Sequence, residues 1–167
     1  MKELVQSLSS LGFSKAGDVV LDTKRGPHFA LAMEPVGHGW VYIWLEMSES
    51  AARVVYIGKA GKTLHERCRQ HVGGFRGGST TGSAHAVRIC AGIASGKRYE
   101  LWSRRAAVVM LFGEHDISLA DIEEKAFIQS FVLPGTSADS RSRRMASPPL
   151  NSSVIPATNT QTAHAHS

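Results

Sequence analysis

The sequence has little of what marks secreted or membrane proteins. Cys68 and Cys90 are its two cysteines, so a disulfide framework is excluded. Its longest uninterrupted apolar run, residues 106–112, has seven residues, whereas a membrane-spanning helix needs about 20. The first residues, Met-Lys-Glu-Leu-Val-Gln-Ser, lack the apolar stretch of a secretory signal. We therefore expect a cytoplasmic protein with no membrane partner.

Aromatic residues make up 7% of the chain and charged residues 20%, but 43% of the 167 residues are hydrophobic. This composition is that of a globular protein with one packed core rather than of a disordered chain. Charge is distributed unevenly. From Arg53 to Arg105 eleven Lys and Arg stand against Glu66 and Glu100, a net charge of +9, while the whole chain carries +5. Such a basic segment indicates a polyanionic partner, although a solvated basic surface without a ligand explains the charge equally well.

The first 60 residues predict a helix and four strands. Leucines at helical spacing place a short helix in residues 1–12, and short strands are expected at 19–22 and 29–33. Residues 40–45 and 53–58 are β-branched and aromatic runs joined by a polar linker, which is typical of an antiparallel pair.

The next segment predicts two helices separated by a glycine-rich loop. Thr63 and Glu66 fit a capping box that starts a helix of about ten residues. Arg67 and His71, four residues apart, share its surface away from the apolar stripe. Residues 73–82 are rich in glycine and are expected to form a loop, which a second helix follows up to Gly96. The apolar stripe of that helix is expected to consist of Val87, Cys90, Ala91 and Ala94.

Two strands and a last helix complete the predicted core. Residues 99–103 and 106–112 look like strands of the same sheet, the second buried because it is apolar throughout. A helix is expected from about Ser118, whose hydroxyl can cap it, to Phe131. One of its faces combines Ala120, Glu124, Phe127, Ile128 and Phe131. A carboxylate in an apolar layer is costly unless a cation compensates it, so Glu124 is a candidate ligand, with Glu123 as its competitor. Residues 134–167 read as irregular, and the end as disordered.

The order of these parts resembles the GIY-YIG nuclease family over residues 39–151. Tyr56-Ile57-Gly58 matches one motif strand, and Trp40-Val41-Tyr42 the other, with Trp40 in place of the usual glycine. Leu64-His65-Glu66-Arg67-Cys68-Arg69-Gln70-His71 is similar to the family's helix with its catalytic arginine. Glu124, followed by Phe127 and Ile128, fits the metal-binding glutamate, and Asn151 resembles the closing asparagine.

The resemblance implies an α+β fold, a small central, mostly antiparallel sheet flanked by helices. It also implies a DNA endonuclease that hydrolyses phosphodiester bonds with one divalent cation, Mg²⁺ or Mn²⁺, held by Glu124. By the same resemblance Tyr42 is the general base, Tyr56 a hydrogen-bonding positioner, Arg67 the phosphate clamp and His71 an assistant in proton transfer. For Tyr42 this requires cationic neighbours that lower its pKa, and His71 and Lys59 are candidates.

We expect further DNA contacts from six positions, Gly58, Lys59, Lys62, Arg69, Arg76 and Asn151. Residues 1–38 are expected to pack on the 39–151 core as a helix and strands, and 152–167 to form a disordered tail. The compact length and the Arg67–His71 pair favour the restriction-type branch, acting as a monomer or homodimer. The alternative is a catalytically inactive nucleic-acid-binding module of the same fold, with Trp40 as a sign of lost activity. In a third interpretation the tyrosines serve the core alone and the basic segment binds another protein.

Overall fold

The structure, a computed structural model, describes residues 2–32 and 37–131. Its elements in chain order are α1 (Lys2–Ser10), β1 (Ser14–Asp22), β2 (Gly26–Leu31), β3 (Trp40–Met47), β4 (Ala52–Ala60), α2 (Leu64–Gly73), the π-helical turn η1 (Gly74–Gly78), α3 (Thr80–Ala94), β5 (Arg98–Arg105), β6 (Val108–Leu111), β7 (His115–Ser118) and α4 (Ala120–Ser130). The predicted irregular segment 134–167 and Asn151 lie outside the described residues.

A five-stranded sheet in the order β2-β1-β5-β3-β4 forms the centre of the fold. Every neighbouring pair in it is antiparallel. The predicted α+β class with a central antiparallel sheet is therefore confirmed. β1 and β2 belong to this same sheet because β1 pairs with β5, so the first 32 residues share its hydrogen-bonded framework.

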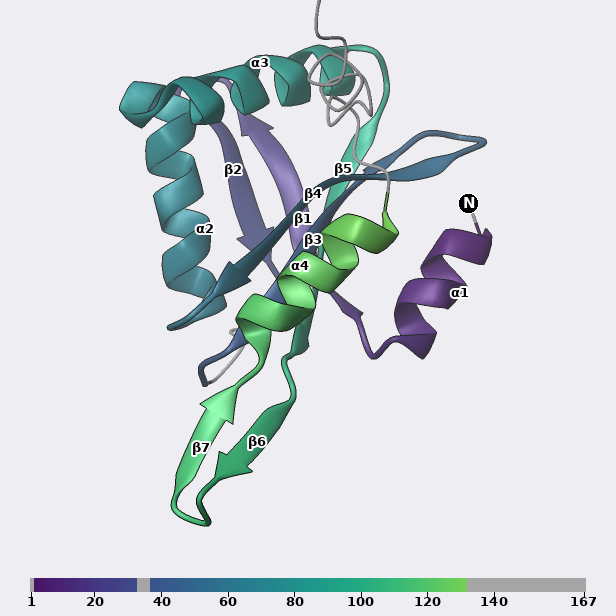
Figure 1. The fold of residues 1–167 in the computed structure, drawn as a ribbon. Coiled ribbons are helices and arrows are strands. Elements are labelled where there is room, and N and C mark those ends of the chain that lie inside the picture. Colours follow the sequence, from purple (N-terminus) through teal and green to yellow (C-terminus); the bar gives the residue numbers. More distant parts are fainter. Residues whose placement is uncertain (1, 33–36, 132–167) are drawn as a thin grey trace, which may run out of the picture. The chain divides into compact units, whose positions relative to one another are not determined.

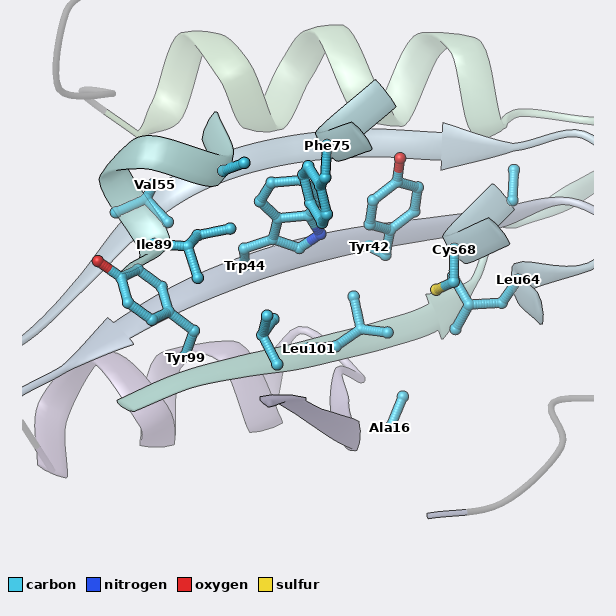
Figure 2. Packing of buried hydrophobic residues seen from close by; sticks show 13 residues of the cluster. Ala16, Tyr42, Trp44, Val55, Leu64, Cys68, Phe75, Ile89, Tyr99 and Leu101 are labelled. Atoms are coloured by element: carbon cyan, nitrogen blue, oxygen red, sulfur yellow. The ribbon is translucent and has the colours of Figure 1, made fainter. Parts of the chain in front are cut away.

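Helices cover both faces of the sheet (Figure 1). On one face α2 and α3 pack over a cluster that includes Tyr42, Trp44 and Leu101. In Figure 2 Tyr42 and Trp44 rise from the same strand on the side where Phe75 lies. On the other face α1 and α4 cover Val41, Ile43 and their neighbours. β3 alternates between these two layers because successive strand residues point to opposite faces, and both layers bury its side chains.

The glycine-rich segment is helical, which corrects the predicted loop. Residues 74–78 form η1, and α3 begins at Thr80 with Ser79 as its cap, whose hydroxyl accepts from the Gly82 amide at 3.0 Å. Gly77 takes a φ of +97°, a conformation that favours glycine, and so allows the turn between the helices.

The buried stripe of α3 consists of Ala86, Ile89 and Gly92, with Ile93 partly buried. The predicted stripe was wrong by one position, and Val87 is 71% exposed. Small residues at both candidate stripes make the two registers hard to distinguish by hydrophobicity. A consequence is that His85, four residues before Ile89, lies on the side of α3 that faces the sheet.

The apolar run 106–112 does not join the central sheet. Val108–Leu111 form β6, which pairs with β7 in a separate hairpin, and every residue of both strands is exposed. Figure 1 shows this hairpin extending away from the sheet. The prediction of a buried strand was wrong because hydrophobicity reports what a strand could bury and not whether another element lies against it.

α4 confirms the last predicted helix, with two differences. Its N-cap is Leu119, and the Ser118 hydroxyl accepts from the Ala120 amide at 3.3 Å. Ile128, expected on the inward face, is 39% exposed, while Phe127 packs edge-on against Phe13. In the described part of the chain no helix has the length and apolar character to span a membrane.

The buried acid Glu46 connects the last residues of β3 to β4 and to the start of β5. Glu46 is 6% exposed and accepts hydrogen bonds from Arg53, Lys97 and Tyr99 at 2.8–2.9 Å. Burial alone would raise the pKa of Glu46, but these three donors outweigh it and lower the pKa to about 2.

Replacing this acid by Glu46→Gln should lower the free energy of unfolding at pH 7 by about 1–3 kcal/mol, because charged hydrogen bonds become neutral ones. The ordinary pKa of 4.5 falls to about 2 on folding, so the contribution is complete above pH 4.5 and is lost as pH falls towards 2. Urea unfolding at pH 7 and pH 3 should therefore show less acid destabilisation in the variant than in the wild type. The exposed Glu49→Gln is the matched control, and equal pH dependence in wild type and Glu46→Gln would contradict the assignment.

Candidate active site

The two motif tyrosines lie on neighbouring strands of the sheet. In the β3–β4 register Tyr42 pairs with Gly58 and Trp44 pairs with Tyr56. The rings of Tyr42 and Tyr56 are stacked with centroids 5.9 Å apart. A Cβ on Gly58 would come within 2.5 Å of the Tyr42 hydroxyl oxygen and 2.7 Å of the Tyr56 ring. The glycine is therefore required by the tyrosine rings, and its contact with a phosphate stays a prediction.

The capping box predicted at Thr63 places Arg67 and His71 opposite these rings. The Glu66 amide donates to Thr63 Oγ1 at 3.1 Å, which confirms where α2 begins. Arg67 Nε donates to the Tyr42 hydroxyl at 3.1 Å, and His71 Nε2 lies 2.5 Å from the same oxygen. Because the arginine can only donate, the tyrosine proton is free to point at His71 Nε2, which then accepts it.

The electrostatics of this triad keep both the tyrosine and the histidine neutral. Burial, helped by the positive charge of Arg67, lowers the pKa of His71 to about 4. Burial and the neighbouring Tyr56 raise the pKa of Tyr42 above its usual value, and Arg67 opposes this without reversing it. The expectation that cationic neighbours lower the pKa of Tyr42 was wrong.

The second expected cation, Lys59, is engaged elsewhere. Its ammonium forms an ion pair with Asp121 and lies 3.9 Å from Glu124 Oε2. Tyr42 is 0% exposed, so its hydroxyl has no contact with solvent in this structure. The Tyr42 hydroxyl thus contacts both Arg67 and His71 inside the core.

Glu124 and Arg67 line one pocket of about 430 Å³, which we call the Glu124 pocket. The connection 59–63, with Lys59 and Lys62, forms part of its wall, and Glu66 and Gln70 of α2 complete it. Lys62 also lies 3.8 Å from Glu66. Residues 57 positions apart in the sequence, Arg67 and Glu124, therefore converge as the resemblance implies.

A second pocket of about 210 Å³ adjoins the first and shares Arg67 and Gln70 with it. We call it the imidazole pocket because His71 and His85 both line it, together with Tyr56 and the start of α3. Arg67 Nη1 donates to Gln70 Oε1 at 2.8 Å, so the guanidinium is held from two sides at the boundary between the two pockets.

Arg69 and Arg76 point elsewhere. They line a third pocket of about 670 Å³ on the other side of α2, with Phe29, His28 and His65 among its walls. The structure therefore separates these two predicted DNA contacts from Arg67, although Phe29 also lies against His71 at 6.1 Å between ring centroids.

Glu123 is the glutamate that the fold uses structurally. Its Oε1 accepts from Arg104 Nη2 at 2.6 Å and from the Ala107 amide at 2.9 Å. Arg104 in turn lies over the rings of Phe13 and Phe127. This arrangement fastens α4 to the end of β5, and of the two neighbouring glutamates it is Glu124 that lines the pocket.

The donor set suits a hard divalent cation with few protein ligands. No group of three or more His, Cys, Asp or Glu that could hold a metal exists among residues 2–32 and 37–131. Asp121 and Glu124, one helical turn apart, both lie within ion-pair distance of the Lys59 ammonium, so carboxylate oxygens already converge on one cationic position. Mg²⁺ and Mn²⁺ accept carboxylate oxygen and fill their other positions with water and phosphate, so this set fits them.

Trp40, which replaces the usual first glycine of the motif, does not intrude on the site. Its indole Nε1 donates to the Gly37 carbonyl at 2.9 Å, and the Arg105 guanidinium lies 5.5 Å from its ring. The substitution is accommodated at the end of β3 and gives no sign of a damaged site.

Sequence reasoning missed Gln70 and His85. Gln70 is three residues after Arg67, a spacing at which helical side chains interact, so this contact was accessible to prediction. His85 becomes visible when the stripe of α3 is read as Ala86, Ile89 and Ile93 instead of Val87, Cys90 and Ala94. Cys68, read as an apolar packing residue, is buried, and burial raises the pKa of its thiol to about 12.

Gly58→Ala should destabilise the protein by about 1–3 kcal/mol, because a rigid, fully buried ring has to move away from the new methyl group. Gly61→Ala in the following connection is the matched control, since a Cβ there meets nothing within 4 Å. Its stability should stay within about 0.5 kcal/mol of the wild type. Urea unfolding of the three proteins checks this, and equal stability of the two variants would contradict the packing role of Gly58.

The sequence matches no protein-family model and no curated protein. Among solved structures the chain is similar to a mutant of bacteriophage T4 EndoII, with a TM-score of 0.62 and 21% identity over 80% of this chain and 98% of that chain. A restriction endonuclease, HPY188I in complex with product DNA, aligns over 90% of this chain and 84% of its own with 12% identity and a TM-score of 0.44. The fold of this chain is therefore similar to that of EndoII.

Proposed function

We propose that this chain is a metal-dependent endonuclease of the GIY-YIG type that hydrolyses phosphodiester bonds in DNA. The observation that carries the proposal is the position of Arg67, which lines both the Glu124 pocket and the imidazole pocket. The net charge of +9 between Arg53 and Arg105 supports a polyanionic substrate. The similarity of its fold to that of bacteriophage T4 EndoII supports the proposal.

Arg67 acts as the phosphate clamp. Its planar, permanently charged guanidinium matches phosphate oxygens and stabilises the charge that develops on them. Hydrogen bonds to Tyr42 and Gln70 fix the orientation of the guanidinium before a substrate arrives, so little reorganisation is needed during the reaction. Lys59 and Lys62 add positive charge along the wall of the Glu124 pocket.

Glu124, with Asp121 close by, would hold the Mg²⁺ or Mn²⁺ ion after displacing the Lys59 ammonium. A cation bound there supplies charge stabilisation to the phosphoryl group and to the departing oxygen. Tyr42 is a positioning residue in this proposal, since its buried hydroxyl connects Arg67 and His71. Tyr56 borders the imidazole pocket and would hydrogen-bond the attacking water.

Purified protein should cleave duplex plasmid DNA with Mg²⁺ or Mn²⁺ and should stop when EDTA is added. Glu124→Gln and Arg67→Lys should each reduce the cleavage rate by about 10²–10³-fold, because one removes the cation ligand and the other replaces a bidentate donor by a point charge. Glu114→Gln, at the exposed tip of the hairpin, is the matched control and should cleave like the wild type. DNA binding without cleavage under all these conditions would favour the inactive binding module instead. Branched and single-stranded DNA should be tested in parallel, because the substrate preference is then read from the same assay.

Arg69 and Arg76 should contribute to DNA affinity and not to the chemical step. The double variant Arg69→Gln with Arg76→Gln should bind DNA more weakly, and the slope of log affinity against log salt should fall by about 2, since two phosphate contacts are lost. Fluorescence anisotropy between low and moderate salt measures the slope, while single-turnover cleavage at saturating protein should be unchanged. An unaltered salt slope would place the DNA elsewhere on the surface.

A further inference from the structure

The pocket of about 670 Å³ that Arg69 and Arg76 line shares no residue with the Glu124 pocket or the imidazole pocket. Its lining comes mainly from β2, α2 and η1, and Figure 1 shows β2, the last strand of the sheet, beside α2. A volume of this size is within the range of about 300–1,000 Å³ that is typical of sites for small ligands. The pocket therefore has room for a single nucleotide.

Part of the lining of this pocket is apolar and aromatic. Phe29, Leu31 and Val72 line it, and all three side chains are half-buried. The Phe29 ring is fixed by the core, because it stacks on Phe75 at 5.9 Å between ring centroids and lies 5.4 Å from Trp44. An aromatic ring held in this way offers a stacking surface for a base and loses little further freedom when the base binds.

The two arginines of the same pocket carry uncompensated positive charge. Arg69 and Arg76 are both exposed, and within residues 2–32 and 37–131 neither guanidinium forms an ion pair or a hydrogen bond. Among the described residues that line the pocket there is no Asp or Glu. The Lys59 ammonium in the Glu124 pocket, by contrast, is paired with Asp121. Two unpaired guanidiniums beside an apolar lining favour a ligand that joins an anionic group to a large apolar ring.

The helix α2 connects this pocket with the phosphate clamp. Arg67 and Arg69 are two residues apart on α2, and they line different pockets. Phe29 lies 6.1 Å from His71 between ring centroids, and His71 contacts the same Tyr42 hydroxyl as Arg67. The clamp and the pocket are thus built on one helix and joined by contacting side chains, which favours the same ligand, DNA, for both.

A nucleotide of single-stranded DNA combines a flat aromatic base with an anionic phosphate. In duplex DNA both faces of a base are covered by its neighbours, so a base enters a protein pocket only where it is unstacked. Building on the proposed function, we propose that this pocket, which we call the base pocket, binds an unstacked base of DNA against Phe29, with Arg69 and Arg76 on the adjoining phosphates. The substrate class of the proposed nuclease is then DNA that carries unpaired nucleotides.

The test compares two fluorescent single strands of about ten nucleotides, one intact and one with abasic sites, which have equal charge and differ only in their bases. Binding is measured by fluorescence anisotropy in EDTA, so that no strand is cleaved. The wild type should bind the intact strand about 10-fold more tightly, the effect expected for stacking on one aromatic ring. Phe29→Leu keeps an apolar side chain without the ring, and its ratio of the two affinities should fall to about 1. Phe112→Leu, 93% exposed in the hairpin, is the matched control and should keep the wild-type ratio.

Photocrosslinking of the wild type to a strand that contains 5-iodouracil gives a second readout, which does not depend on the folding of Phe29→Leu. Peptide mapping should place the crosslink on β2 or on α2. If the wild type binds the two strands equally, if folded Phe29→Leu keeps the wild-type ratio, or if the crosslink lies on other elements only, the base pocket is assigned wrongly.

Further outcomes separate the base pocket from other ligands and from the nuclease reaction. If a free deoxynucleoside monophosphate binds the wild type as tightly as the intact strand, the ligand is a free nucleotide and the proposal is wrong. Cleavage of DNA with Mg²⁺ or Mn²⁺ is scored in a separate assay. Base-dependent binding through Phe29 without any cleavage would support the base pocket and overturn the proposed nuclease function, whereas cleavage without base-dependent binding would do the reverse.

Discussion

The arrangement of the site depends on one buried hydroxyl. The oxygen of Tyr42 accepts from Arg67 Nε and lies 2.5 Å from His71 Nε2, so it connects a strand to a helix through polar contacts inside the core. A buried hydroxyl without partners costs free energy, which makes this geometry strongly preferred over alternatives that break it. Gly58 is part of the same constraint, because it leaves the space that the ring fills. The strand register that pairs Tyr42 with Gly58 thereby fixes where the guanidinium and the imidazole can lie.

Arg67 extends from its buried contact with Tyr42 to the surface, where it contacts Gln70. Tyr42 and Gln70 accept hydrogen bonds from Nε and Nη1 of the guanidinium. Its other N–H groups lie at the boundary of two pockets that differ in chemistry. One contains the carboxylate of Glu124 and the lysines of the 59–63 connection, and the other contains aromatic and imidazole side chains. Negative and proton-accepting groups are thus separated by a fixed cation. In the proposed hydrolysis, this fixed guanidinium would hold the phosphate at the boundary of the two pockets.

Much of the framework could be predicted from local patterns. The Thr63 cap and the β-branched runs of β3 and β4 are encoded within a few residues, and the structure has the cap hydrogen bond and the antiparallel pair. The predictions that were wrong concern features that depend on residues far away in the sequence. Val108–Leu111 form one strand of an exposed hairpin that pairs only with β7, and the pKa of Tyr42 rises because burial outweighs the charge of Arg67. His85 was overlooked since α3 has small residues on two adjacent stripes, and only contact with the sheet selects between them.

The raised pKa of Tyr42 and the lowered pKa of His71 have a common cause and a common effect. Both shifts follow mainly from burial, which disfavours the charged form of either group. The pair therefore stays neutral, and the positive charge of Arg67 is left uncompensated by Tyr42 or His71. A phenolate in contact with Arg67 would neutralise the clamp before a phosphate could reach it. In the proposed reaction, keeping the tyrosine protonated would leave the charge of the guanidinium available to the substrate phosphate.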